Sequence, residues 1–317
     1  RELVRFGEDH FLIEGGIFSR ERDFVSRIEF HAGRRKKITV NKVPAKNASE
    51  LSQVLGTVFF SPEDLYLIRE GAAARRRFMD ISLCQLRPRY AAALAEYNRL
   101  LDHKTRILRD CEEKPDLLAT LPDFNLRMAE TGAVVIHYRA RFTQLLAEYA
   151  AAAHRECSGG KETLEIQYQT VKTVTDPFAD HQTIVTQLIE HQHSHAHAEM
   201  AVGQCLSGPH KDDLEVLLNG LSAKSFASQG QTRTAAISLK LAQRQLMGRE
   251  SGEIPVLLLD DVLSELDQTR QRQLMSSFGD IQIFITSTEM DRETGRKIPD
   301  HTVFHVENGT VHSDDNL

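Results

Sequence analysis

Two adjacent carboxylates at the end of an apolar run are the side chains of this sequence best placed to do chemistry. Asp260 and Asp261 directly follow the uninterrupted apolar run 256–259, which predicts a β-strand covered on both faces. The carboxyl ends of such strands form the edge at which open α/β sheets bind ligands. One carboxylate there could hold Mg²⁺, and the other could orient or deprotonate a water molecule. The start of an ordinary turn would explain the same residues equally well.

A second candidate is a helix start that contains a glycine, at residues 228–231. Ser228 followed by Gln231 has the spacing of a capping box at the start of a helix over 231–247. Gly230 would let a ligand approach the backbone closely, and the free N–H groups and dipole of a helix start suit an anion. A well-capped helix without a ligand has the same pattern.

The order of the motifs is more specific than any one of them. The capped helix is followed by the apolar strand that ends in Asp-Asp, by Ser-Glu-Leu-Asp at 264–267, and by a second apolar strand at 281–286. Asp267 alone is simply a natural N-cap for the next helix. The ordered set, however, resembles the back half of an ABC-type ATPase head, with a signature motif, a Walker B strand, a D-loop and the strand that leads to the switch residue.

Most of the remaining chain must position these motifs. Alternating polarity predicts strands at 10–14, 23–30 and 36–40, and a short buried strand at 57–60. Ser-Pro-Glu-Asp at 61–64 then supplies the N-cap, first-turn proline and first-turn acids of a helix.

Two seven-residue patterns predict an antiparallel helical hairpin. Mostly apolar residues, with Lys104 and Thr131 among them, recur at alternating intervals of four and three over 90–111 and again over 128–149, with a proline-containing connection between the two stretches. Ordinary amphipathic core helices would show the same pattern. A strand at 163–168 and a helix at 180–201 follow, and an Asn-Gly turn at 219–220 predicts a β-hairpin.

Composition excludes several classes of protein. The chain has 317 residues, 41% of them apolar, and a net charge of −6, which excludes disorder as its main state. Its four cysteines form no C-x-x-C pair, so no disulfide framework or zinc knuckle is indicated. No apolar run is long enough for a membrane span, and we expect a cytoplasmic protein. Residues 1–110 hold 21 Lys+Arg against 15 Asp+Glu and the remainder 18 against 30, which suggests an anionic partner on one side.

Motifs along essentially the whole chain resemble the RecF family, the bacterial recombination mediators among the SMC-like ABC ATPases. The matching stretches are Phe-Ser-Pro-Glu-Asp-Leu at 60–65, Arg-Arg-Arg-Phe-Met-Asp at 75–80, Leu-Ser-Gly-Pro-His-Lys-Asp-Asp at 206–213, Ser-Gln-Gly-Gln-Thr-Arg at 228–233, and the Asp-Asp segment at 257–267.

The resemblance implies an α/β fold: an ABC-type ATPase head, that is a P-loop NTPase fold with a mixed sheet and N-terminal antiparallel strands, plus a mainly helical second lobe. Residues 1–61 and 204–317 would form the ATPase lobe and 62–203 the helical lobe. The implied function is an ATP-dependent DNA-binding clamp that dimerises on ATP. It would act with RecR and RecO to load RecA at gapped or junction DNA, in recombinational repair, replication-fork maintenance and the SOS response. A weak DNA-dependent ATPase activity is expected of the full-length protein. The alternative is an ABC-type ATPase subunit of a membrane transporter.

The resemblance also implies roles for the candidate residues. Asp260 would coordinate Mg²⁺, and Asp261 would position the water that attacks ATP. Further nucleotide contacts, several of them to the ATP held by the other subunit, would come from Ser228, Gln229, Gly230, Gln231, Asp267 and Thr286. The resemblance does not identify the switch residue, because transporter-type ATPases have a histidine in the stretch where this chain has Thr-Ser-Thr, at 286–288.

One family motif does not occur in the sequence. No G-x-x-x-x-G-K-[ST] is present, and the only Gly-Lys pair, at 160–161, is followed by Glu162. RecF proteins carry this phosphate-binding loop near the N-terminus, and the chain starts at Arg1 rather than Met. We therefore expect that an N-terminal piece with the loop is missing from this sequence.

Basic residues at two places are candidates for contact with DNA phosphates. They are Arg75, Arg76 and Arg77 near a helix start, and Arg34 and Lys36 near a predicted strand. Ion pairing with Asp64 and Asp80 would explain the first group as well, and protection of an edge strand would explain the second.

Histidines recur within the predicted helix 180–201, at His191, His193, His195 and His197. A metal site is conceivable, but a solvated helix face is the favoured interpretation because no acidic or cysteine partner has metal-site spacing. His210, beside Gly-Pro, is interpreted as a structural turn residue.

Overall fold

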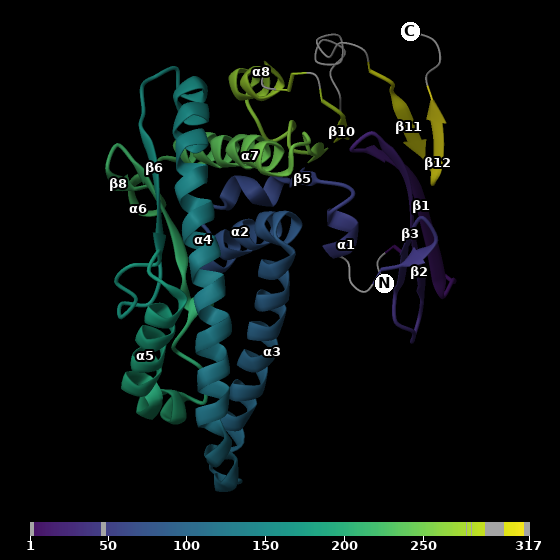
Figure 1. Cartoon of the computed structure of the whole chain (residues 1–317). Helices are drawn as coiled ribbons and strands as arrows, with labels where there is room; N and C mark the ends of the chain where they lie inside the picture. The colour runs from purple at the N-terminus through teal and green to yellow at the C-terminus, as the bar shows by residue number, and fades with distance from the viewer. Residues whose placement is uncertain (1–2, 46–48, 277, 280, 289–300, 314–317) are drawn as a thin grey trace.

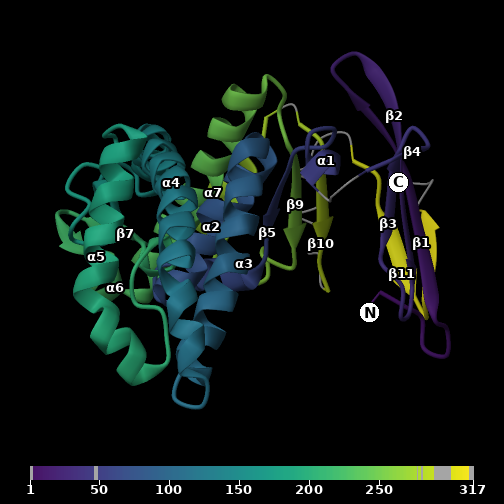
Figure 2. The same ribbon diagram turned by 60° about the horizontal axis from the view of Figure 1, so that its bottom comes forward.

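The computed structural model describes residues 3–45, 49–276, 278–279, 281–288 and 301–313. Three bodies lie side by side: a group of long helices, a small parallel sheet, and an antiparallel sheet on the far side (Figures 1 and 2). This arrangement confirms the predicted mixed α/β fold with antiparallel strands at the N-terminus.

The antiparallel sheet has the strand order β1-β2-β3-β4. Its strands are β1 (His10–Ser19), β2 (Arg22–His31), β3 (Lys37–Val40) and β4 (Val43–Pro44). Asn41 and Lys42 join β3 to β4 with φ of 49° and 67°, as a tight hairpin turn requires. The prediction of a basic edge strand is wrong: residues 34–36 lie in the β2–β3 loop, and β3 lies between two other strands.

The parallel sheet carries the Asp-Asp pair at its carboxyl edge. It consists of β5 (Thr57–Phe60), β9 (Val256–Asp260) and β10 (Ile283–Thr286), in the order β10-β9-β5.

Only one face of β9 is fully covered in the described structure. Leu257 and Leu259 are buried and pack with Ile237 and Leu241, which lie on a long helix. Leu258, between them, is only partly buried. The expectation of two covered faces is therefore wrong, because an apolar run alone cannot distinguish coverage of one face from coverage of two.

The helical body contains the predicted helical hairpin. It is formed by α3 (Pro88–Asp110) and α4 (Leu121–Cys157), which run side by side in opposite directions (Figure 1). Tyr97 and Lys104 of the predicted seam are 2% and 1% exposed, so the pattern does mark the packed face. Around the hairpin lie α2 (Ala72–Leu86), α5 (His181–Val202) and α7 (Gln229–Ser251). In the described part of the chain, no helix combines the length and apolar character that a membrane span needs.

A third sheet crosses the predicted boundary between residues 203 and 204. In it, β6 (Leu164–Gln169) pairs with β7 (Asp213–Leu218), which continues into β8 (Leu221–Ser222). The shorter elements are α1 (Ser49–Ser52), η1 (Pro62–Tyr66), η2 (Pro115–Thr120), η3 (Pro209–Lys211), α6 (Ala223–Phe226), α8 (Gln268–Ser276), β11 (Phe304–Glu307) and β12 (Thr310–Ser313).

His210 has the structural role that the sequence indicated. Its Nε2 lies 2.9 Å from the carbonyl of Cys205 and its Nδ1 2.7 Å from the hydroxyl of Tyr97. A carbonyl can only accept, so Nε2 carries the proton and Nδ1 accepts from Tyr97. Gly208 makes room for this contact, since a Cβ there would lie 2.3 Å from the Tyr97 hydroxyl and its φ is +126°.

Burial lowers the pKa of His210 to about 4, which predicts a loss of stability in acid. Because the folded pKa lies below the value of about 6.5 for unfolded histidine, neutral His210 stabilises the fold fully above that pH and progressively less down to pH ~4. We expect His210→Gln to flatten the fall in unfolding free energy between pH 7 and pH 5 by roughly 2 kcal/mol. Urea unfolding at several pH values measures this, and parallel pH profiles for the two proteins would contradict it.

Candidate functional site

The carboxyl edge of the parallel sheet presents a carboxylate and a hydroxyl side by side. Asp260 ends β9 and is paired in register with Thr286, which ends β10. The Thr286 hydroxyl donates to Asp260 Oδ1 at 2.5 Å, and both side chains are exposed. Such oxygen donors at a sheet edge suit a hard cation such as Mg²⁺.

Asp261 has an unusual backbone conformation. Its φ is 51°, a left-handed value that few non-glycine residues adopt and that often occurs at functional sites. The conformation is held by Thr286, whose carbonyl and hydroxyl oxygens lie 3.0 and 3.2 Å from the Asp261 backbone nitrogen.

The Asp261 carboxylate also has an unused acceptor. Its Oδ1 is buried and receives no hydrogen bond from the described residues. A buried oxygen without a donor is costly, and native proteins seldom leave one without a reason. The arrangement fits a carboxylate that receives a proton or hydrogen bond from a water molecule or ligand.

The helix start at 228–231 has the predicted capping box. The Ser228 hydroxyl accepts from the Gln231 N–H at 3.3 Å, and the Gln231 side chain accepts from the Ser228 N–H at 2.8 Å. Gln231 also donates to Glu162 at 2.8 Å, so its amide is already held on both sides. Ser228 and Gln229 remain exposed at the helix start.

An arginine that the sequence analysis did not single out joins this helix start to the predicted D-loop. Arg270 of α8 donates to the Gly230 carbonyl at 2.9 Å and to the Thr234 hydroxyl at 3.0 Å, and it forms an ion pair with Asp267. A Cβ at Gly230 would lie 2.9 Å from Arg270 Nη2. Gly230 therefore makes room for this arginine. The only sequence signal was the i,i+3 spacing of Asp267 and Arg270.

Asp267 caps α8 as predicted. Its Oδ1 accepts from the N–H groups of Thr269 and Arg270 at 3.0 Å each. The hydrogen bond from the Arg270 backbone is the main cause of the lowered pKa of Asp267. Arg233 of α7 adds a second link, since it donates to the Glu265 carbonyl at 2.8 Å. Hydrogen bonds from Arg270 and from Arg233 thus connect the start of α7, residues 228–234, to residues 265–270.

Arg75 does not have the predicted role in DNA contact. Its side chain is 5% exposed and forms two hydrogen bonds to Asp213, at 2.7 and 2.8 Å. It also donates to the Glu70 carbonyl at 2.7 Å. The guanidinium therefore forms its hydrogen bonds inside the protein, and the prediction that Arg75 contacts DNA phosphates is wrong.

The neighbours of Arg75 differ from it in exposure. Arg76 is half-buried and donates to the Asp212 carbonyl at 2.7 Å, whereas Arg77 is exposed. The acids proposed as alternative partners are paired elsewhere, Asp64 with Lys240 and Asp80 with Arg139.

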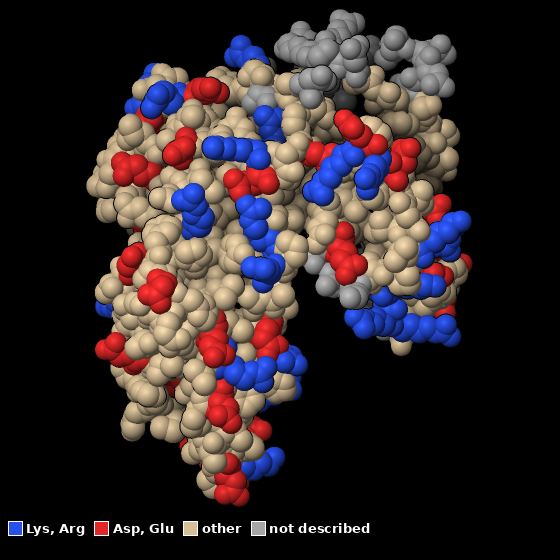
Figure 3. Space-filling view, viewed as in Figure 1, with Lys and Arg blue, Asp and Glu red and all other residues tan. Residues whose placement is uncertain are grey.

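A basic surface lies on the antiparallel sheet. Arg34 and Lys36 are exposed in the β2–β3 loop, and Figure 3 shows blue side chains gathered at the lower end of this sheet. On the sheet itself, a shallow depression is lined by Arg27, Glu29, Lys37, Thr39 and Lys42. Three of these five are basic, so the surface suits an anionic partner.

The α5 histidines form no shared site. His191 is 8% exposed and its Nδ1 lies 2.8 Å from the Ser207 hydroxyl, while its ring stacks on His195 with centroids 4.0 Å apart. His193 and His197 are exposed on another face. The solvated-face interpretation therefore holds for this second pair and is wrong for His191.

Comparison with known proteins gives consistent relatives. No protein-family model matches the chain. The DNA replication and repair protein RecF of Agathobacter rectalis is 38% identical over 313 residues, which are 98% of this chain and 83% of that protein. RecF of Clostridioides difficile is 37% identical over 317 residues, 100% of this chain and 84% of that protein.

Solved structures give the same result. The recombination mediator protein RecF-ATP in the RecFOR pathway is 31% identical, with a TM-score of 0.87 over 98% of this chain and 82% of that one. A second RecF structure of that pathway is 30% identical, with a TM-score of 0.88 over 99% of this chain and 82% of that one.

Proposed function

The chain belongs to the RecF family of DNA replication and repair proteins, with the fold of an ABC-type ATPase head, and on that premise we propose that it is an ATP-gated DNA-binding clamp. The observation that carries the proposal is the pair Asp260–Asp261 at the sheet edge. The first carboxylate is exposed beside a hydroxyl, and the second has a left-handed backbone and a buried oxygen that receives no hydrogen bond from the described residues.

ATP with Mg²⁺ is the cofactor that these residues fit. A solved relative is RecF-ATP, which supports the nucleotide. Asp260 and Thr286 offer oxygen ligands for the cation, which would neutralise charge on the phosphates. Asp261 would orient the attacking water through its unpaired oxygen. The loop that cradles the phosphates does not occur in these 317 residues, and we propose ATP hydrolysis for a protein that combines these residues with such a loop.

A second copy of the chain would complete the nucleotide site. Ser228 and Gln229 are exposed at a helix start, where free N–H groups favour a phosphate. Arg270 and Arg233 hold this helix start against the D-loop, so both would meet the partner as one unit. The γ-phosphate of the partner's ATP would therefore order both segments, and dimerisation would depend on ATP.

DNA, RecO and RecR are the proposed partners. The solved relatives belong to the RecFOR pathway, which supports RecO and RecR as partners. The exposed basic residues on the antiparallel sheet, together with Arg77 on α2, support binding of an anionic polymer. We propose action in the cytoplasm at gapped or junction DNA, with RecA loading as the outcome. We also propose that residues 62–203 form a separate helical lobe. Its boundary with 204–317 is crossed by the pairing of β6 with β7. The transporter alternative is not favoured, since the relatives reported above are RecF proteins.

Salt dependence of DNA binding tests this proposal. In full-length protein with ATP, Arg34→Gln combined with Lys36→Gln should reduce the slope of log K against log salt by about 2, because each phosphate contact contributes roughly 0.9. Arg141→Gln with Lys172→Gln removes the same charge from exposed positions on α4 and in the loop between β6 and α5 and should leave the slope unchanged. A flat salt response of the unmodified protein would count against the DNA clamp.

A further inference from the structure

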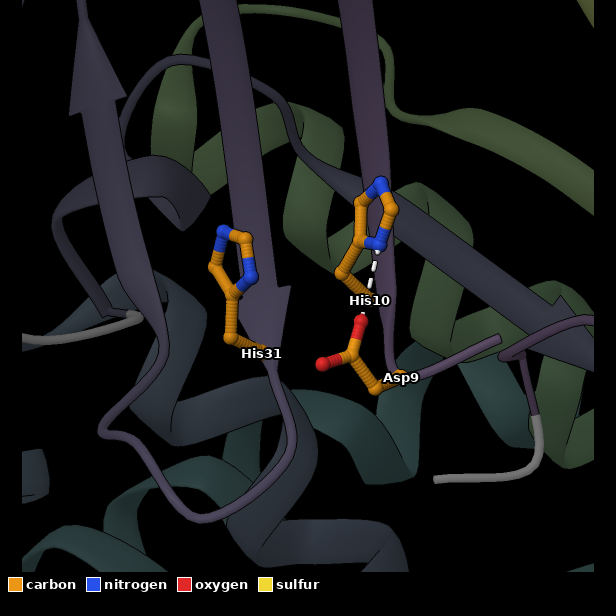
Figure 4. A group of neighbouring side chains, drawn as sticks. All are labelled: Asp9, His10 and His31. Atoms are coloured by element: carbon orange, nitrogen blue, oxygen red, sulfur yellow. Dashed lines mark hydrogen bonds and ion pairs between the residues drawn. The ribbon is translucent and has the colours of Figure 1, made fainter. Parts of the chain in front are cut away.

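We propose that Asp9, His10 and His31 form a binding site for a divalent transition-metal ion, with Zn²⁺ as the expected occupant. The three residues lie at the end of the β1–β2 pair (Figure 4). One ligand atom from each lies within 4.8 Å of those of the others. Within the described ranges, this is the one group of three or more His, Cys, Asp or Glu side chains that approach so closely.

The backbone fixes the relative positions of these ligands. His10 and His31 are direct cross-strand partners, and the pairing extends one step further through a 2.7 Å hydrogen bond from the Ala32 N–H to the Asp9 carbonyl. Directly opposed residues place their side chains on one face of an antiparallel pair. Accordingly, the imidazole rings stack with centroids 5.3 Å apart and planes inclined by 14°.

The donor set selects the class of metal. Two imidazole nitrogens and one carboxylate oxygen, with a position left for water, are typical ligands of Zn²⁺ and related ions. Bonds of about 2 Å in a tetrahedron separate neighbouring ligand atoms by ~3.3 Å. Asp9 Oδ1 and His10 Nδ1 are already 3.1 Å apart.

Side-chain rotation is enough to close the site. The side chains of Asp9, His10 and His31 are 79%, 53% and 40% exposed, so packing does not lock their rotamers. Glu29 lies on the same strand as His31, with its Oε1 3.5 Å from His31 Nε2. It can orient that ring, as carboxylates beside metal-bound histidines do.

A bound ion would stiffen the start of the β2–β3 loop, which carries Arg34 and Lys36. His31 is the last residue of β2, and its carbonyl accepts from the Arg34 N–H at 3.1 Å. Joining His10 to His31 would therefore hold the end of β2, from which the loop with Arg34 and Lys36 emerges. This consequence for DNA contact rests on the proposed function, whereas metal binding itself does not.

Titration of the tag-free, chelator-treated chain with Zn²⁺ by calorimetry tests the proposal, with Co²⁺ absorption as a report on coordination. We expect one Zn²⁺ per chain with micromolar affinity. His10→Ala combined with His31→Ala should abolish it, and Asp9→Asn should weaken it roughly tenfold, the loss of about 1.4 kcal/mol. Circular dichroism verifies that the variants fold, as the exposure of the three side chains leads us to expect.

The matched control is His193→Ala combined with His197→Ala, which removes two exposed histidines of α5 and should leave the stoichiometry and affinity unchanged. Absence of Zn²⁺ binding to the unmodified chain would overturn the proposal. Binding that survives the loss of His10 and His31, or that disappears with His193 and His197, would overturn it too. Neither result depends on ATP or DNA, so failure here leaves the proposed function intact.

Discussion

Asp261→Asn should slow ATP hydrolysis by the full-length protein about 10²-fold or more while ATP-dependent dimerisation persists. The amide keeps the size of the side chain but cannot take a proton from water, and such a group typically contributes ~10² to 10⁴ in rate. This prediction concerns the buried Oδ1, which accepts no hydrogen bond within the part of the chain that the structure describes. Asp260 and Thr286 stay unchanged, so the proposed cation ligands remain.

Single-turnover hydrolysis and light scattering with ATP measure the two effects separately. Asp102→Asn is the control, because it makes the same change of charge at an exposed position of α3, outside the proposed nucleotide site and interface. Its rate should stay within about twofold of the unmodified protein. Normal turnover by Asp261→Asn would refute the role given to this carboxylate.

Ser228→Arg should prevent dimerisation on ATP and leave ATP binding by the monomer intact. The new side chain places bulk and positive charge at an exposed helix start that we propose faces the second subunit. It also removes the cap oxygen that accepts from the Gln231 N–H, a loss of about 1 kcal/mol. The residues proposed to hold Mg²⁺ lie on other elements, which is why nucleotide binding should persist.

Ser228→Ala separates these two causes. It removes the same cap without adding bulk, so ATP should still drive dimerisation of this variant. Light scattering gives the oligomeric state, and a fluorescent ATP analogue gives the monomer affinity. If Ser228→Arg dimerised as readily as Ser228→Ala, the helix start would lie outside the interface.

Local features of the fold could be predicted because neighbouring residues determine them. The capping box at Ser228 needs only the spacing to Gln231, and the strand Thr57–Phe60 is marked by its composition and the proline that follows. The packed seam of the helical hairpin follows from its periodicity, which includes even the buried Lys104.

Features that depend on distant partners could not be predicted in this way. The partner of Arg75 is Asp213, 138 positions along the chain, so three consecutive arginines looked equivalent although the first is buried. The left-handed backbone of Asp261 depends on hydrogen bonds to Thr286 of another strand. The Arg270 contact with Gly230 likewise joins residues 40 positions apart. Sequence patterns identify candidate groups, and the folded chain decides which of them are free to bind a ligand.

The most direct test of the ATP-gated clamp is the affinity of the full-length protein for gapped DNA with ATP, with ADP and without nucleotide, measured by fluorescence anisotropy at fixed salt. We predict that ATP raises the affinity at least tenfold, about 1.4 kcal/mol, together with a doubling of mass, and that Ser228→Arg loses both effects. Equal affinity in all three nucleotide states would contradict the account.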